Sequence, residues 1–273
     1  MCGRYVMARA TSDLVALGDA EANEDLVLRQ SWNVAPTAEV PILVAHADDG
    51  GAGVTRRIHV ARWGLVPPWA KELSVGSRAF NARSETVASK PTFRAAVRAR
   101  RCAVPVEGYY EWKTPEPGAK GPDGRAAKKQ PYYVHPAGAG DGEGPVIWFA
   151  GLYEWWQDPE AKAAGEDAWV LSTTILTMAA PDADDDDPVL AALGQLHDRM
   201  PVPMDAETMD RWLTPDTLGS AEEADALVGQ VCAGAYDVAA GWSLRPVGGA
   251  VGNVRNNGPE LIQEMREQQG TLL

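Results

Sequence analysis

The chain of 273 residues contains little cysteine, and its three cysteines, Cys2, Cys102 and Cys232, do not follow a C-x-x-C spacing. Three thiols cannot all pair, and without that spacing neither a disulfide framework nor a zinc site is supported. We expect Cys102, in an apolar strand-like run, and Cys232, in a helix, to be buried thiols without chemical consequence. No metal or other cofactor is expected.

Long hydrophobic runs are also missing from the sequence. No run approaches the roughly 18 apolar residues that a membrane-spanning helix needs. The N-terminus lacks the basic and then apolar pattern of a secretion signal. The hydrophobic content of 45% is ordinary for a globular protein. We therefore expect a cytoplasmic, monomeric protein with no membrane partner.

The chain has no overall positive charge, and a net charge of −13 argues at first against a nucleic-acid partner. The distribution of charge reverses this inference. Residues 51–130 carry 16 Lys and Arg against 6 Asp and Glu, whereas residues 131–273 carry 6 against 24. Salt screens charges beyond a Debye length of about 10 Å, so a local basic surface matters more to a docking polyanion than the total does. The alternative is a solvated basic face without a partner.

The first residues, Met1-Cys2-Gly3-Arg4, carry the most informative pattern. If Met1 were removed, Cys2 would hold a free α-amine and a thiol two carbons apart. Such an aminothiol condenses with an aldehyde to an imine, and its thiol then closes a thiazolidine ring. The α-amine has a reference pKa of about 7.7 to 8.0, which leaves a neutral fraction near neutral pH. From these residues alone, Cys2 is equally well an incidental second residue in an N-terminal strand.

Short apolar runs bounded by Gly and Pro recur along the chain and predict strands. They are Val40 to Ala45, Arg57 to Trp63, Cys102 to Val106, Pro131 to Val134, Val146 to Leu152, Trp169 to Leu176 and Trp242 to Val247. Helical spacing of apolar residues is found at Ser12 to Leu17, Pro91 to Arg98, Ala206 to Leu213 and Ala221 to Cys232. This mixed order favours an α+β fold with a largely antiparallel, barrel-like β core and peripheral helices.

We expect one domain over residues 1–273, with a core at about 2–262. Two stretches rich in Gly, Pro and charge, at about 115–129 and 137–145, are typical of exposed loops. The segment at about 181–188 contains the acidic run Asp184 to Asp187. Without metal-ligand spacing, this run also indicates a solvated loop.

Seven segments, taken in their order along the chain, contain residues suited to chemistry or binding. They are Met1 to Arg4, Trp32 to Thr37, Trp63 to Trp69, Phe80 to Thr86, Glu107 to Trp112, Leu196 to Pro201 and Gly252 to Asn256. Each is weak alone, but in this order they closely resemble the SOS response-associated peptidase family, the abasic-site processing proteins. The resemblance runs from Cys2 to about Ile262.

This resemblance implies one α+β domain that binds single-stranded DNA and crosslinks to abasic sites through the N-terminal cysteine, protecting them in the DNA damage response. It implies that Cys2 is the nucleophile and that Glu111 shuttles protons during imine formation and ring closure. His197 is implied as a second acid-base group, acting on the sugar hydroxyl or on reversal of the adduct. Asn81 would orient the N-terminus or the opened sugar. The resemblance further implies that the protein is located at the nucleoid when it is bound to DNA.

The resemblance also implies a set of DNA contacts. Arg4 and Arg83 match arginines that hold flanking phosphates, a geometry suited to the guanidinium. Asn33 lies in a matching segment and is assigned to DNA binding. Trp69, after two prolines, would stack on a base, which contributes about 1 to 3 kcal/mol without selecting sequence.

Structural alternatives remain for residues taken singly. Glu111 fits an exposed position on an alternating strand, and His197 fits a structural hydrogen-bonding role. Asn81 is suited to a turn, and Trp69 to the core.

Other functions compete with this assignment. A glutamine amidotransferase-like amidohydrolase also begins Met-Cys-Gly and exposes its cysteine, although this chain has no attached synthetase domain and the segments around Asn81 and His197 are not expected of that family. Peptidase action, by self-removal of Met1 or on another protein, is a third reading. Passive binding of single-stranded DNA without chemistry is a fourth.

Overall fold

The computed structural model describes residues 2–48, 53–121, 123–138 and 144–265 of the chain. Five strands close into a barrel in the order β3, β4, β10, β9, β6. Neighbouring barrel strands run antiparallel except β4 and β10, which are parallel. Their bounds are β3 (Glu39–Ala47), β4 (Val54–Trp63), β6 (Arg101–Val106), β9 (Ile147–Gln157) and β10 (Trp169–Ala179).

Three short strands extend this sheet. β5 (Asn81–Arg83) and β11 (Arg199–Pro201) pair with β10, and β12 (Pro203–Met204) pairs with β9. The parallel pairing of β5 with β10 sets Asn81 beside Ile175. These elements are too short to be predicted from local pattern, because their pairing partners define them.

A second, antiparallel sheet has five strands in the order β2, β1, β7, β8, β13. Their bounds are β1 (Tyr5–Met7), β2 (Ser31–Val34), β7 (Gly108–Lys113), β8 (Gln130–Pro136) and β13 (Trp242–Pro246). β1 lies between β2 and β7, and Cys2, three residues before its start, is wholly buried.

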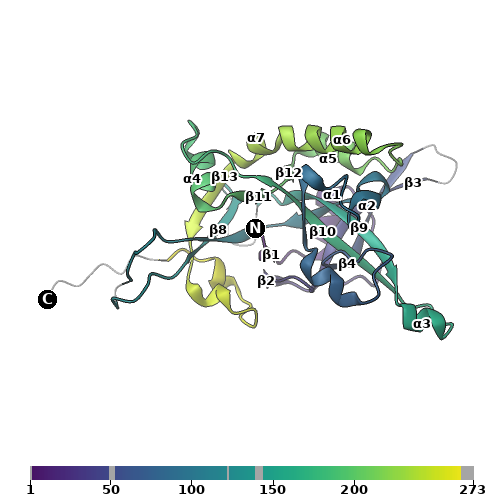
Figure 1. Cartoon of the computed structure of the whole chain (residues 1–273), viewed down its shortest axis with the longest axis horizontal. Helices are drawn as coiled ribbons and strands as arrows, with labels where there is room; N and C mark the ends of the chain where they lie inside the picture. The colour runs from purple at the N-terminus through teal and green to yellow at the C-terminus, as the bar shows by residue number, and fades with distance from the viewer. Residues whose placement is uncertain (1, 49–52, 122, 139–143, 266–273) are drawn as a thin grey trace.

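Helices surround these sheets, and Figure 1 shows α5, α6 and α7 along one side and α3 at the tip of the β9–β10 hairpin. The α-helices are α1 (Thr11–Gly18), α2 (Arg94–Ala99), α3 (Pro159–Ala163), α4 (Pro188–Leu196), α5 (Ala206–Leu213), α6 (Ala221–Ala233) and α7 (Ala235–Ala239). Short 3₁₀ helices are η1 (Leu73–Arg78), η2 (Ser84–Thr86), η3 (Gly249–Gly252) and η4 (Pro259–Ile262). Among the described residues, none of the helices combines the length and the apolar character that crossing a membrane requires.

Side-chain caps fix where several helices begin. Asp205 and Ser220 accept backbone N–H bonds at the starts of α5 and α6, a contribution of about 1 kcal/mol each. Asp187 caps α4, and Pro188 follows at the first helical position. Asp187, the end of the acidic run, is therefore a helix N-cap, whereas Asp184 and Asp186 are exposed as expected.

The core is built around large aromatic side chains. Trp63 and Trp212 are wholly buried, and each donates its indole N–H to a backbone carbonyl, those of Phe80 and Cys102 respectively. These bonds satisfy the polar atom of an otherwise apolar side chain. Cys102 is buried as expected, while Cys232 is only partly buried.

The predicted α+β class with a barrel-like, largely antiparallel core is confirmed, and all seven predicted strands are present. The segment at 115–129 forms the exposed β7–β8 connection, although residue 122 lies outside the described residues. Of the segment predicted as a loop at 137–145, residues 139–143 lie outside the described part of the chain.

Candidate functional site

Cys2 lies just before β1 and is wholly buried. Burial raises the pKa of its thiol well above the usual value, and the negative charge of Glu111 raises it further. Both effects disfavour the thiolate. The Glu111 carboxylate therefore lies close enough to Cys2 for its charge to act on the thiol.

Glu111 lies on β7 and is buried, with only 6% of its surface exposed. The pairing of Tyr5 with Tyr109 sets β7 beside β1, and Glu111 lies two residues further along the same face as Tyr109. Its Oε1 accepts the backbone N–H of Trp112 over 3.2 Å. The exposed position that the alternating pattern favours for Glu111 is therefore not observed.

Two tyrosines that the sequence did not single out border Cys2. Tyr5 and Tyr109 are both buried, and burial raises the pKa of each well above its ordinary value. A negative charge on Cys2 would add to both shifts, and the charge of Glu111 adds to the shift of Tyr109. Burial thus favours the neutral phenol at both positions.

Asn81 reaches Cys2 from the other sheet. Its Nδ2 donates a hydrogen bond to the Cys2 backbone carbonyl over 2.8 Å. Its Oδ1 is buried and has no hydrogen-bond partner among the described residues. The structure thus brings together three of the predicted residues, Cys2, Asn81 and Glu111, from segments far apart in sequence.

His197 follows the last residue of α4, a helix that packs against β7, the strand of Glu111. The Arg199 backbone N–H donates to His197 Nδ1 over 3.0 Å, and Asp198 Oδ1 lies 2.6 Å from the same nitrogen. The first contact requires an unprotonated Nδ1 and the second a protonated one. The two contacts together hold the imidazole ring in place.

Arg4 and Asn33 form one network. Arg4 Nη1 donates to Asn33 Oδ1 and to the Val251 carbonyl, each over 2.8 Å. Asn33 Nδ2 donates to the carbonyls of Val251, Asn253 and Asn256 over 2.9 to 3.3 Å. These bonds fasten the segment 251–256, which contains the motif segment Gly252 to Asn256, to β2. Asn33 is buried, and its amide serves to hold this segment through hydrogen bonds. Its assignment to DNA binding stays a prediction.

Arg83 and Trp69 are exposed. Arg83 ends β5, two residues after Asn81, and therefore points to the same side of the strand. The Trp69 side chain is 60% exposed, while its neighbour Ala70 packs with Trp156 and accepts the indole N–H of Trp156 over 2.8 Å. Trp69 thus lies on an anchored loop with its ring in solvent, and the core position open from the sequence alone is excluded.

An ion pair links two motif segments that sequence reasoning did not connect. The Arg199 guanidinium binds both carboxylate oxygens of Glu85 and donates to the Thr177 carbonyl over 2.7 Å. Hydrogen bonding from Arg199 lowers the pKa of Glu85 below its usual value. The pair ties the His197 segment to the segment that carries Asn81 and Arg83. Within the described residues no group of three or more His, Cys, Asp or Glu side chains gathers as a metal site.

Comparison with known proteins gives a consistent result. A model of the family described as "SOS response associated peptidase (SRAP)" matches residues 1–254. The abasic site processing protein YoqW of Bacillus subtilis is 31% identical over 268 residues, covering 96% of this chain and 99% of that protein. The abasic site processing protein HMCES of Rattus norvegicus is 27% identical over 258 residues, covering 85% of this chain and 64% of that protein.

A solved structure shares the fold. A crystal structure of a protein from Bacteroides thetaiotaomicron aligns with a TM-score of 0.69 at 20% identity, covering 97% of this chain and 100% of that one. The architecture of two sheets and surrounding helices is therefore found in an experimentally determined structure.

Proposed function

Because this chain belongs to the SOS response associated peptidase family, we propose that it processes abasic sites in single-stranded DNA by covalent attachment through Cys2. The convergence of Asn81 and Glu111 on a buried Cys2 is the observation that carries this proposal. The proposal requires removal of Met1, since an amide at Cys2 leaves a thiol without a reactive amine. Removal of Met1 by Cys2 itself or by an aminopeptidase would meet this requirement equally, because both leave a free α-amine on Cys2.

The substrate chemistry matches the aminothiol. A ring-opened abasic deoxyribose presents an aldehyde at C1′. The α-amine adds to this carbon, the resulting hydroxyl leaves as water, and an imine forms. The thiol sulfur then bonds to the imine carbon while its proton passes to the nitrogen, which closes the thiazolidine. One water is released in total, and no oxidant or cofactor is consumed.

Glu111 is suited to both proton transfers. In its protonated form it can donate to the departing hydroxyl, and as a carboxylate it can relay the thiol proton to nitrogen. Because the thiol closes the ring on the imine carbon, the amine reacts first and the thiol second. Acid-base assistance of this kind typically contributes 10² to 10⁴ in rate.

Asn81 and His197 complete the proposed machinery. Asn81 Nδ2 fixes the Cys2 carbonyl, and its Oδ1 can accept a hydrogen bond from the liberated α-amine. His197 Nδ1 contacts the Arg199 backbone N–H and the Asp198 carboxylate, which hold the ring in place. We assign it to proton transfer during opening of the sugar ring or reversal of the adduct. Arg83 and Trp69, both exposed, are proposed to contact a flanking phosphate and a base of the DNA strand.

One incubation separates this proposal from the amidohydrolase and passive-binding alternatives. The protein is mixed in parallel with abasic single-stranded DNA, with undamaged DNA and with glutamine. We expect a covalent adduct of protein plus DNA less one water with abasic DNA only, and no ammonia from glutamine. Ammonia release without an adduct would support the amidohydrolase, and reversible binding alone would support a passive binder.

A further inference from the structure

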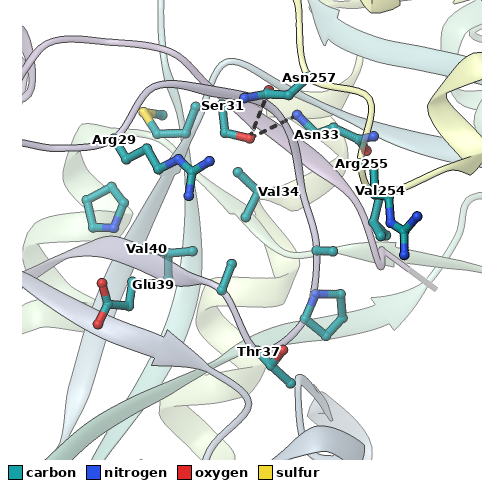
Figure 2. Close-up of a pocket in the computed structure, with 15 residues that line it drawn as sticks. Arg29, Ser31, Asn33, Val34, Thr37, Glu39, Val40, Val254, Arg255 and Asn257 are labelled. Carbon is teal, nitrogen blue, oxygen red and sulfur yellow. Dashed lines mark hydrogen bonds between the residues drawn. The ribbon is translucent and has the colours of Figure 1, made fainter.

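Two neighbouring cavities meet at the start of β3, and together they are called the groove. The first, of about 680 Å³, is lined by β2, residues 35–38, the start of β3 and residues 254–257 (Figure 2). The second, of about 460 Å³, lies between β4, η1 and the β9–β10 hairpin. Thr37 and Glu39 line both cavities, so the two cavities adjoin at these residues.

The first cavity is flanked by unpaired arginines. Figure 2 shows Arg29 and Arg255 on opposite sides of it, with Val34 between them. Both are exposed, and neither forms an ion pair with another described residue. Glu39 is the single acidic residue among those that line this cavity. Two guanidinium groups without a carboxylate partner suit a phosphate-bearing ligand.

The second cavity presents aromatic rings. Trp155 and Trp169, from β9 and β10, line it with 45% and 51% of their surface exposed. The Trp169 indole N–H donates to Asp167 over 2.6 Å, which holds the ring in place. Arg62 lines the same cavity and has no ion-pair partner in the described part of the chain. Exposed indole rings beside a cationic side chain are the features that bind single-stranded nucleic acid in other folds.

The two cavities meet at a residue whose backbone conformation is strained. Thr37 has a φ of 78°, which is a left-handed conformation that a β-branched residue rarely adopts. Its backbone N–H donates to the Trp63 carbonyl over 2.7 Å, which fastens the turn to β4. Such strain persists where the surroundings hold it and is concentrated at functional sites. It gives the middle of the groove a fixed shape.

We propose that this groove is a second binding track for single-stranded nucleic acid, with phosphates at Arg29 and Arg255 and bases stacked on Trp155 and Trp169. The inference rests on the proposed function and extends it to nucleotides beyond the abasic one. Asn33 lines the groove and binds Arg4, two residues from Cys2, which connects the track to the reaction site.

The track has a definite end at the β9–β10 hairpin. Beyond Trp169 the hairpin carries four carboxylates and one lysine, namely Asp158, Glu160, Glu166, Asp167 and Lys162. This local negative charge repels phosphate, so the strand does not continue along the hairpin tip. The contact is therefore limited in length and should be detectable as a dependence of affinity on oligonucleotide length.

The test compares undamaged oligothymidylates of about 4 and about 16 nucleotides, the range of site sizes of single-strand-binding folds. Fluorescence anisotropy measures their affinity for wild type, R29A/R255A, W155A/W169A and the control R211A, whose arginine pairs with Glu207 on α5. Circular dichroism melts establish that all variants are folded. Each protein is also crosslinked to a short abasic oligonucleotide, which does not need the track.

We expect wild type and R211A to bind the longer oligonucleotide more tightly. R29A/R255A should lose affinity for it and flatten the salt dependence by about 1.4, at about 0.7 per phosphate contact. W155A/W169A should lose about thirtyfold in affinity, from about 1 kcal/mol for each of the two stacked bases, with the salt slope retained. Crosslinking of the short abasic oligonucleotide should stay at the wild-type rate in every variant.

Unchanged affinity of both double variants for the longer oligonucleotide would overturn the track while leaving the crosslinking proposal intact. Altered self-association of W155A/W169A in sedimentation, with DNA affinity retained, would assign the indoles to a protein contact and also overturn it. Failure of the wild type to crosslink the short abasic oligonucleotide would instead refute the proposed function.

Discussion

The side chain of Asn81 donates a hydrogen bond to the backbone carbonyl of Cys2 over 2.8 Å, joining the strand β5 to the residue that precedes β1. The bond fixes the position of the Cys2 backbone without engaging its thiol. The Oδ1 atom of the same amide has no partner among the described residues. One side chain can therefore hold the Cys2 carbonyl and receive the α-amine at the same time.

Replacement of Asn81 by Ala should slow adduct formation without weakening DNA binding. A hydrogen bond of this kind contributes about 1 kcal/mol, so the loss of one or two bonds should reduce the rate by roughly five- to thirtyfold. Single-turnover crosslinking alongside equilibrium binding separates the two effects. A variant with wild-type rates would make Asn81 a purely structural residue.

Replacement of Glu111 by Gln should reduce the rate of adduct formation by about 10² to 10⁴, because the amide cannot donate or relay a proton. His197→Ala should act more on sugar-ring opening or on release of the adduct. Both variants should bind an uncleavable abasic analogue normally. The measurement is single-turnover crosslinking and release over a range of pH, and wild-type behaviour of both variants throughout that range would refute the assigned roles.

Replacement of Arg83 by Ala should flatten the salt dependence of binding to single-stranded DNA by about 0.7, the expected loss for one phosphate contact. Arg125, an exposed arginine in the β7–β8 connection, provides a matched control. Affinities measured at several salt concentrations give the slope. Equal slopes for R83A, R125A and wild type would remove Arg83 from the DNA contact.

The histidine pair on the barrel should make stability fall in mild acid. His46 Nε2 lies 3.1 Å from His59 Nε2, and burial and the nearby Arg57 lower the pKa of both. The unfolded chain therefore binds more protons below its histidine pKa of about 6.5. Stability is present above that pH and is lost as the pH falls toward the lowered folded values. Urea unfolding of wild type and H59Q should show a smaller acid loss in H59Q, and equal losses would contradict this account.

The sequence was informative where the local pattern and the tertiary structure agree. The seven predicted strands are apolar runs that remain strands in the barrel and the second sheet. Helix α5 was predicted with its observed bounds because its apolar residues follow helical spacing. Helix α4 was missed because Asp187 and Pro188, which begin it, were interpreted as part of an acidic loop.

The site could be predicted only in part. Single residues gave no reason to bury Glu111, whose burial follows from the position of β7 between β1 and β8. The Arg199–Glu85 pair spans 114 residues and depends on the pairing of β5 and β11 with β10. The use of Asn33 to bind residues 251–256 likewise depends on a contact between distant segments. Such contacts have no signature in the local sequence.

The most direct test of the central claim is the site of attachment in a protein that has reacted with abasic single-stranded DNA. Intact mass and peptide mapping of wild type should show a chain that begins at Cys2, with one DNA remnant on that residue as a thiazolidine. Cys2→Ala should bind the DNA normally and give no stable adduct. A stable adduct that persists in Cys2→Ala, maps to Cys102 or Cys232, or forms while Met1 is fully retained would contradict the mechanism.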